Sequence, residues 1–130
     1  MNSGMELRNW GMTLLRAVVG VVFVMHGWQK LGMGFHQVAE YLETASIPYP
    51  ETAAVVLTVA ELFGGMALIL GVLTRYVAVA LAFDMSVAII TVHAKNGFFM
   101  PNGIEFPMVL LVANLCLIMG GGGVFELFRF

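Results

Sequence analysis

Residues 10–28 read WGMTLLRAVVGVVFVMHGW, a stretch whose one charged residue is Arg16. A helix needs roughly 20 mainly apolar residues to cross the hydrocarbon core of a bilayer. Comparable apolar stretches follow at residues 52–73, 75–93 and 104–120. The sequence therefore predicts an all-α integral membrane protein, a four-helix bundle whose two ends lie on the same side of the membrane.

The composition agrees with this interpretation. Of the 130 residues, 60% are hydrophobic and 11% are charged, whereas an average soluble domain carries about 25% charged residues. A soluble bundle would need a charged outer face on each helix, and the stretch 52–73 contains Glu61 as its one charged residue. Six Lys and Arg against eight Asp and Glu leave no basic surface, so we expect no nucleic-acid partner. The single cysteine, Cys116, excludes an internal disulfide, and we expect no metal and no covalent cofactor.

The connection between the first two spans contains an amphipathic segment. Residues 35–46 place Phe35, Val38 and Leu42 near one helical stripe and most polar residues elsewhere. This pattern predicts a short helix that lies in the membrane interface. We expect the four spans and this interfacial helix to form a single domain.

Positive residues near the span ends favour cytoplasmic termini. Arg8, Arg75 and Arg129 lie on the side of the termini, whereas Lys30 and Lys95 lie on the opposite side. Cytoplasmic loops carry the excess of Lys and Arg. The count therefore favours both termini in the cytoplasm.

Three ionisable residues lie inside the predicted spans, where a charge is costly unless it is paired or hydrated. At 1.5 Å per residue, Arg16 lies about 9 Å into its span, and Glu61 and Asp84 lie about 13 Å into theirs. We expect the three to meet in one layer near mid-membrane as the catalytic group. With two acids against one arginine, one carboxyl group should hold an exchangeable proton. A buried ion-pair cluster that only fixes helix register is the open alternative.

A second polar group should collect near the membrane surface opposite the termini. Residues of three span ends meet there, and we expect them to bind a small polar head group. They are His26, Lys30, His93, Lys95 and Glu105.

Glycines at helix-packing intervals predict close contacts between the spans. Gly64 and Gly65 follow Glu61 on its own helix face and would let a neighbouring helix approach the carboxylate. Gly20 and Gly71 belong to the same predicted packing set.

Two ordered motifs resemble a known family. Residues 14–31 fit the pattern LLRxxxGxxFxxHGxxKL, and residues 61–75 fit ExxGGxxLxxGxxTR. Together they resemble the DoxX family of small four-helix membrane proteins. The resemblance implies a bundle in the bacterial cytoplasmic membrane and a link to the membrane subunits of thiosulfate:quinone oxidoreductase. It also implies a set of polar family positions, which here are Arg16, His26, Lys30, Glu61 and Arg75.

We therefore expect a membrane subunit of a quinone-linked oxidoreductase system, in which the mid-membrane cluster handles protons near a quinone head group. A non-catalytic anchor or assembly subunit stays open as an alternative, as does an oligomeric transporter of small solutes. The expected partners are the lipid bilayer, a bound quinone, soluble or membrane redox subunits, and further copies of the chain.

Overall fold

The computed structural model describes residues 3–124 and residue 126, and every regular element in that part of the chain is helical. Arg129, which entered the orientation count, lies outside the described residues. The elements in chain order are α1 (Ser3–Met33), α2 (Phe35–Thr44), α3 (Pro50–Leu70), α4 (Thr74–Ala88), the π-helical turn η1 (Ile89–His93), the 3₁₀ turn η2 (Ala94–Asn96) and α5 (Glu105–Gly120).

The predicted all-α membrane architecture is confirmed, with changes at the helix boundaries. Three helical stretches are long and apolar enough to span a bilayer, namely Ser3–Met33, Pro50–Leu70 and Thr74–Asn96. The fourth apolar helix, α5, has 16 residues, about 24 Å at 1.5 Å per residue. Helix α1 begins seven residues before the predicted first span, because a polar stretch continues a helix beyond the apolar window when no proline interrupts it.

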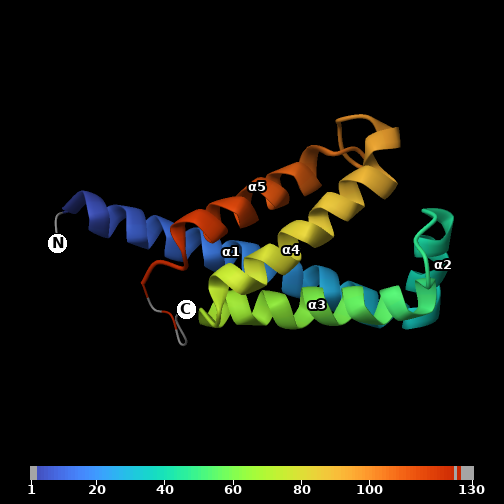
Figure 1. Ribbon diagram of the computed structural model, residues 1–130, viewed down its shortest axis with the longest axis horizontal. Helices are drawn as coiled ribbons and strands as arrows, with labels where there is room; N and C mark the ends of the chain where they lie inside the picture. The colour runs from blue at the N-terminus through green and yellow to red at the C-terminus, as the bar shows by residue number, and fades with distance from the viewer. Residues whose placement is uncertain (1–2, 125, 127–130) are drawn as a thin grey trace.

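The helices pair in two antiparallel hairpins, α1 with α3 and α4 with α5. Figure 1 shows the α4–α5 hairpin crossing the α1–α3 pair at an angle, and the two hairpins diverge at the end away from the chain termini. Glycines set the closest contact within the first pair. A Cβ atom on Gly20 would lie 2.7 Å from the carbonyl oxygen of Gly65, and one on Gly27 would lie 2.6 Å from the amide nitrogen of Leu62. These glycines therefore fix the register of α1 against α3.

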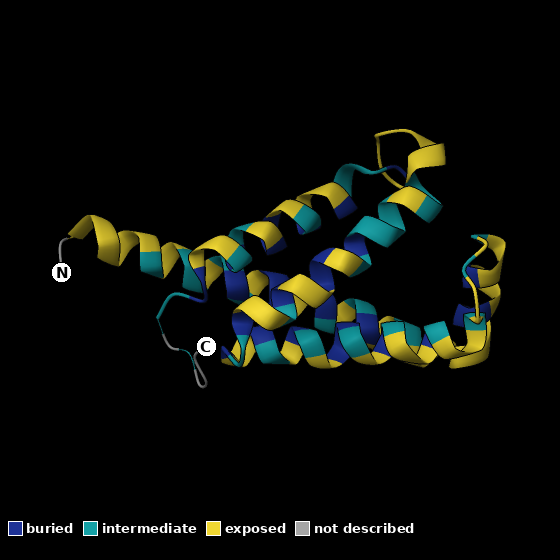
Figure 2. Ribbon diagram, viewed as in Figure 1, coloured by how far each residue is buried: buried dark blue, intermediate teal, exposed yellow. Residues whose placement is uncertain are grey.

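The core lies where the two hairpins cross. Phe23, Leu68, Leu81 and Leu117, one from each long helix, are all at most 1% exposed. The outer faces are apolar as well, and Figure 2 shows exposed residues along the outside of every helix. On α1 these outward residues recur at helical spacing as Leu14, Val18, Val21 and Met25. Helices that are apolar on both their inner and outer faces are typical of a bilayer environment.

Helix α2 lies across the far end of the α1–α3 pair (Figure 1). It buries Val38, Ala39 and Leu42 against Ala54 of α3. Tyr41 of the same helix stays exposed. The segment predicted as an interfacial helix is thus packed on the bundle through one half of its apolar stripe.

Candidate functional site

A salt bridge between α1 and α3 forms the centre of the candidate site. Lys30 Nζ lies 2.7 Å from Glu61 Oε1, and the two side chains are 22% and 4% exposed. Glu61 lies near the middle of α3. The contact is possible because Gly27, one turn before Lys30, brings the backbone of α1 against Leu62.

Asp84 of α4 joins this pair from the other hairpin. A Cβ atom on Gly64 would lie 3.4 Å from the side chain of Leu81, so α3 and α4 approach each other here. One turn back along α3 is Glu61, and one turn forward along α4 is Asp84, which brings the two carboxyl groups side by side. The Asp84 carboxyl group interacts with the carboxyl group of Glu61 and lies close enough to Lys30 for an electrostatic interaction with its ammonium group. Its Oδ2 atom is buried and has no hydrogen-bond partner within the described residues. A buried carboxyl oxygen in this condition is costly unless a proton, a water or a ligand satisfies it.

His26 is the fourth member of the group, which we call the charge cluster: His26, Lys30, Glu61 and Asp84. Its ring stacks on Phe106 of α5, with centroids 5.8 Å apart and an interplanar angle of 25°. The imidazole lies within range of the charges of Lys30 and Glu61. Residues from α1, α3 and α4 therefore assemble two carboxyl groups, one ammonium group and one imidazole around the buried Glu61, with His26, Lys30 and Asp84 partly buried.

Arg16 does not lie in this cluster, so the predicted meeting of Arg16 with the two acids is wrong. Its Nη1 atom donates to the main-chain carbonyl oxygens of Gly122, at 3.0 Å, and Val124, at 3.2 Å. The guanidinium also lies against Gly71 at the end of α3, which is about 15 Å along that helix from Glu61. The prediction counted depth from the start of each apolar stretch, whereas the glycine contacts set an antiparallel register in which Glu61 faces Lys30.

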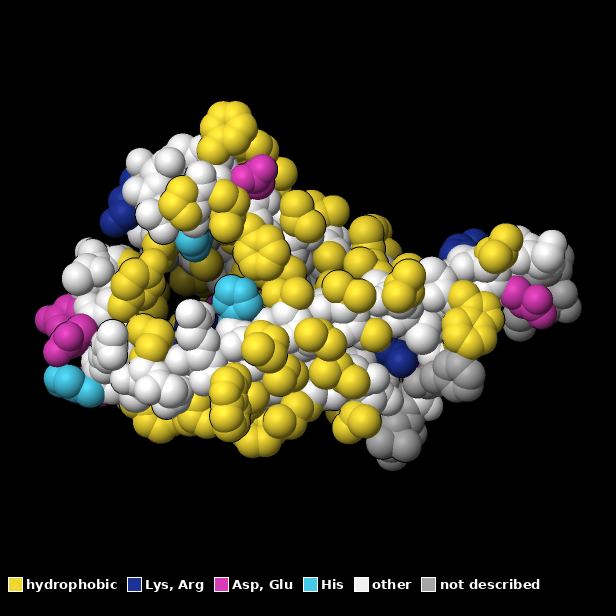
Figure 3. All heavy atoms as spheres, turned by 180° about the vertical axis from the view of Figure 1, so that it is seen from behind, with side chains coloured by type: hydrophobic (Ala, Val, Ile, Leu, Met, Phe, Trp, Pro, Cys, Tyr) yellow, Lys and Arg dark blue, Asp and Glu magenta, His cyan; other side chains and the backbone are white. Residues whose placement is uncertain are grey.

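A small cavity of about 240 Å³ lies at the diverging end of the hairpins, between α2 and the turns that follow α4. His93, Lys95 and Asn102 line it on one side, and Tyr41 of α2 lines it on the other. Figure 3 shows the molecule hollowed at this end. Sequence reasoning placed His93 and Lys95 at this surface but missed Tyr41, because nothing in the local pattern indicates that α2 faces the end of α4.

The π-helical turn η1 determines how His93 is presented. One added residue in a turn rotates everything that follows by about 100° relative to a continuous α-helix. His93 Nδ1 then lies 2.9 Å from the main-chain carbonyl oxygen of Asn102. Since a carbonyl oxygen only accepts, Nδ1 carries the proton, and Nε2 is left to a ligand.

Two further predicted positions have mainly local contacts. Glu105, expected at the head-group site, accepts a hydrogen bond from the amide of Met100 at 3.0 Å and so closes the loop before α5. Gly71 adopts φ 75° at the turn after α3, a left-handed conformation that glycine adopts without strain. Gly71 was predicted to pack two helices together, and in the structure it forms the turn after α3, beside Arg16.

Sequence comparisons identify the family of this chain. A model of the DoxX family matches residues 11–94, a range that contains the whole charge cluster. The chain belongs to the DoxX family. The DoxX match also includes Arg16 and ends one residue after His93.

Named relatives place this DoxX protein among membrane proteins. It is 34% identical over 121 residues to "Putative oxidoreductase CatD" of Bacillus subtilis, with 93% of this chain and 84% of that protein covered. It is 29% identical over 122 residues to "Inner membrane protein YphA" of Escherichia coli, with 89% and 86% covered. A protein of Haemophilus influenzae is 40% identical over 68 residues, which cover 52% of this chain and 45% of that protein. No solved structure matches the chain.

Proposed function

We propose that this DoxX protein is a membrane subunit of a quinone-linked oxidoreductase system, in which the charge cluster exchanges protons. The observation that carries the proposal is the position of Asp84. Its carboxyl group lies beside a second carboxyl group, and one of its oxygens is buried without a partner in the described part of the chain. The word oxidoreductase in the name of the Bacillus relative supports the redox assignment.

The charge balance explains why this place can exchange a proton. Lys30 neutralises one carboxylate, Glu61, through the 2.7 Å contact. A second carboxylate within a few ångströms in a membrane interior would carry an uncompensated charge. Asp84 therefore holds a proton at rest and releases it when another cation or a protonated His26 comes near. Lys30 and Glu61 alone would make a purely structural pair, and the addition of Asp84 makes the cluster reactive.

In this proposal the cavity between α2 and the turns after α4 receives the polar ring of the quinone. His93, whose Nε2 is left to a ligand, and Lys95 both line the cavity, and they would hold the oxygens of a quinone. A quinone takes up electrons and protons together on reduction. In this proposal His26, which stacks on Phe106 and is acted on by the charges of Lys30 and Glu61, passes protons between the carboxyl groups and the quinone.

The test compares variants of the two acids in the assembly as it is purified from its own membranes. Glu61→Gln and Asp84→Asn keep the shape of each side chain and remove its ionisation. We expect both variants to retain decylubiquinone binding and to lose quinone-dependent electron transfer by about 100-fold or more per assembled complex. Glu43→Gln, which changes an exposed carboxylate on α2, is the matched control and keeps the wild-type rate.

Two results would contradict the proposal in different ways. An undiminished rate per complex in Glu61→Gln and Asp84→Asn, with fewer complexes assembled, would assign the cluster to an anchor or assembly role. Failure of the wild-type assembly to bind decylubiquinone would remove the quinone link.

A further inference from the structure

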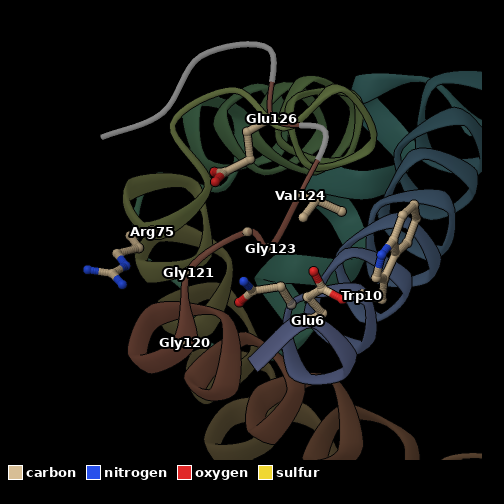
Figure 4. A pocket seen from close by; sticks show the side chains of 10 residues that line it. Glu6, Trp10, Arg75, Gly120, Gly121, Gly123, Val124 and Glu126 are labelled. Carbon is tan, nitrogen blue, oxygen red and sulfur yellow. The ribbon is translucent and has the colours of Figure 1, made fainter. Parts of the chain in front are cut away.

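A larger cavity lies at the opposite end of the molecule, where α1 begins and α5 ends. It has a volume of about 540 Å³, within the range of small-ligand sites. Figure 4 shows Glu6 and Trp10 of α1 on one side of the glycine run 120–123, with Arg75 of α4 at the other edge. This cavity shares no residue with the charge cluster or with the hollow beside His93.

Three polar side chains at this cavity have no partner in the described part of the chain. Glu6, Asn9 and Arg75 line the cavity, and none of their side chains makes a hydrogen bond or an ion pair within residues 3–124 and 126. Glu126 also lines it, but its charge acts on Arg16. The cavity thus offers one uncommitted carboxylate and one uncommitted guanidinium, an arrangement that complements a ligand with both charges.

A buried hydroxyl lies directly behind the cavity wall. Thr74 is 1% exposed, and its Oγ1 has no hydrogen-bond partner within the described residues. It lies 2.8 Å from the place that a Cβ atom on Gly122 would occupy, and Glu126 approaches the same place. Any side chain at Gly122 would displace Glu126 and close the space, so the glycine keeps the cavity open beside an unsatisfied polar atom.

The position of the cavity points to the membrane surface. Arg75 lies at the start of α4 and Gly120 at the end of α5, so the cavity lies at the level where these apolar helices leave the bilayer. Trp10 is 52% exposed here, and tryptophan concentrates at the depth of the lipid head groups. Apolar helix faces that could accompany acyl chains continue directly below, at Leu14 and Val18.

We propose that this cavity binds the head group of an aminophospholipid, with the ammonium group beside Glu6 and the phosphate beside Arg75. The guanidinium matches a phosphate in charge and geometry. The carboxylate and the nearby indole of Trp10 both favour an ammonium group. A purely anionic head group gains the contact with Arg75 and meets repulsion from Glu6, so the cavity selects a zwitterionic lipid.

Native mass spectrometry of the full chain in mild detergent tests this proposal. The protein is mixed with equal amounts of phosphatidylethanolamine and phosphatidylglycerol that carry identical acyl chains, and the retained lipids are counted. The wild type should retain about tenfold more phosphatidylethanolamine, the selectivity expected from one charge-assisted hydrogen bond. Glu6→Gln should bring the ratio near one, and Arg75→Gln should lower retention of both lipids. Glu43→Gln, at the far end of the molecule, should keep the wild-type ratio.

The same experiment identifies the source of the head group. Soluble O-phosphoethanolamine at the lipid concentration should not be retained, because it lacks the acyl chains. Retention equal to that of the lipid would assign the cavity to a soluble ligand and overturn the proposal. An equal lipid ratio in the wild type, or an unchanged ratio in Glu6→Gln, would overturn it as well. None of these readouts depends on quinone-dependent turnover, so the outcome is independent of the proposed function.

Discussion

Two cations on α1, the buried Arg16 and the partly buried Lys30, are held in different ways. Arg16 is bound by main-chain carbonyl oxygens of the segment after α5, whereas Lys30 is bound by the carboxylate of Glu61, beside Asp84. Carbonyl groups cannot take up or release a proton, so these two hydrogen bonds fasten α1 to the segment after α5, where the charge of Glu126 also acts on Arg16. Carboxyl groups can, so the Lys30 site is the one with chemistry available. The direct hydrogen-bond partners of a cation in a membrane helix thus distinguish a fastening contact from a place where a proton can be exchanged.

The largest effect should come from removing the cation of the charge cluster. Lys30→Met leaves Glu61 and Asp84 without a counter-charge, and we expect a loss of about 3 kcal/mol in the free energy of unfolding. The double variant Lys30→Met/Glu61→Leu should regain most of this loss, because it removes both members of the pair. Unfolding in mixed SDS micelles measures both variants. An unchanged stability in Lys30→Met would mean that the salt bridge does not hold α1 to α3.

A smaller loss is expected at the Arg16 site. Arg16→Met removes the hydrogen bonds to Gly122 and Val124, with an expected cost of about 2 kcal/mol. The amide of Val124, which donates to Thr13 Oγ1 at 2.7 Å, should exchange its hydrogen faster. Quinone-dependent turnover per folded complex should stay at the wild-type level. Lost turnover at wild-type stability would return Arg16 to the catalytic group in which the sequence alone placed it.

The smallest effect separates two adjacent glycines. A Cβ atom on Gly65 would lie 2.6 Å from the carbonyl oxygen of Gly20, whereas one on Gly64 would meet the side chain of Leu81 at 3.4 Å. Gly65→Ala should therefore push α1 from α3 and cost about 1.5 kcal/mol. Gly64→Ala should change stability by less than about 0.5 kcal/mol. Equal effects in SDS unfolding would mean that Gly65 does not set the register of the charge cluster.

The helical membrane architecture could be predicted because it depends on composition and on the length of each apolar stretch. Which charges meet could not be predicted, because that depends on the register between helices. Gly20 and Gly27 set this register through backbone contacts, and small-residue spacing alone does not show which residue of the partner helix each glycine faces. The partner of Arg16 was hidden for a similar reason. Arg16 donates hydrogen bonds to main-chain carbonyl groups, which leave no signal in the sequence.

The head-group region shows a second limit of sequence reasoning. A regular α-helix would carry the 3.6-residue period to the end of the third span, whereas the turn at Ile89–His93 is π-helical. The direction of His93 and its contact with Asn102 follow from that irregular turn. The histidine itself could be identified as a candidate because it lies at the end of an apolar span.

Infrared difference spectroscopy of the purified assembly with bound decylubiquinone tests the central claim most directly. The spectrum is recorded between the oxidised and the electrochemically reduced states, in H₂O and in D₂O. A protonated carboxyl band that changes on reduction and shifts in D₂O is predicted for the wild type and for Glu43→Gln, and it should be absent from Asp84→Asn. Full reduction of the quinone without any change in a carboxyl band of the wild type would contradict the assignment of proton exchange to the charge cluster.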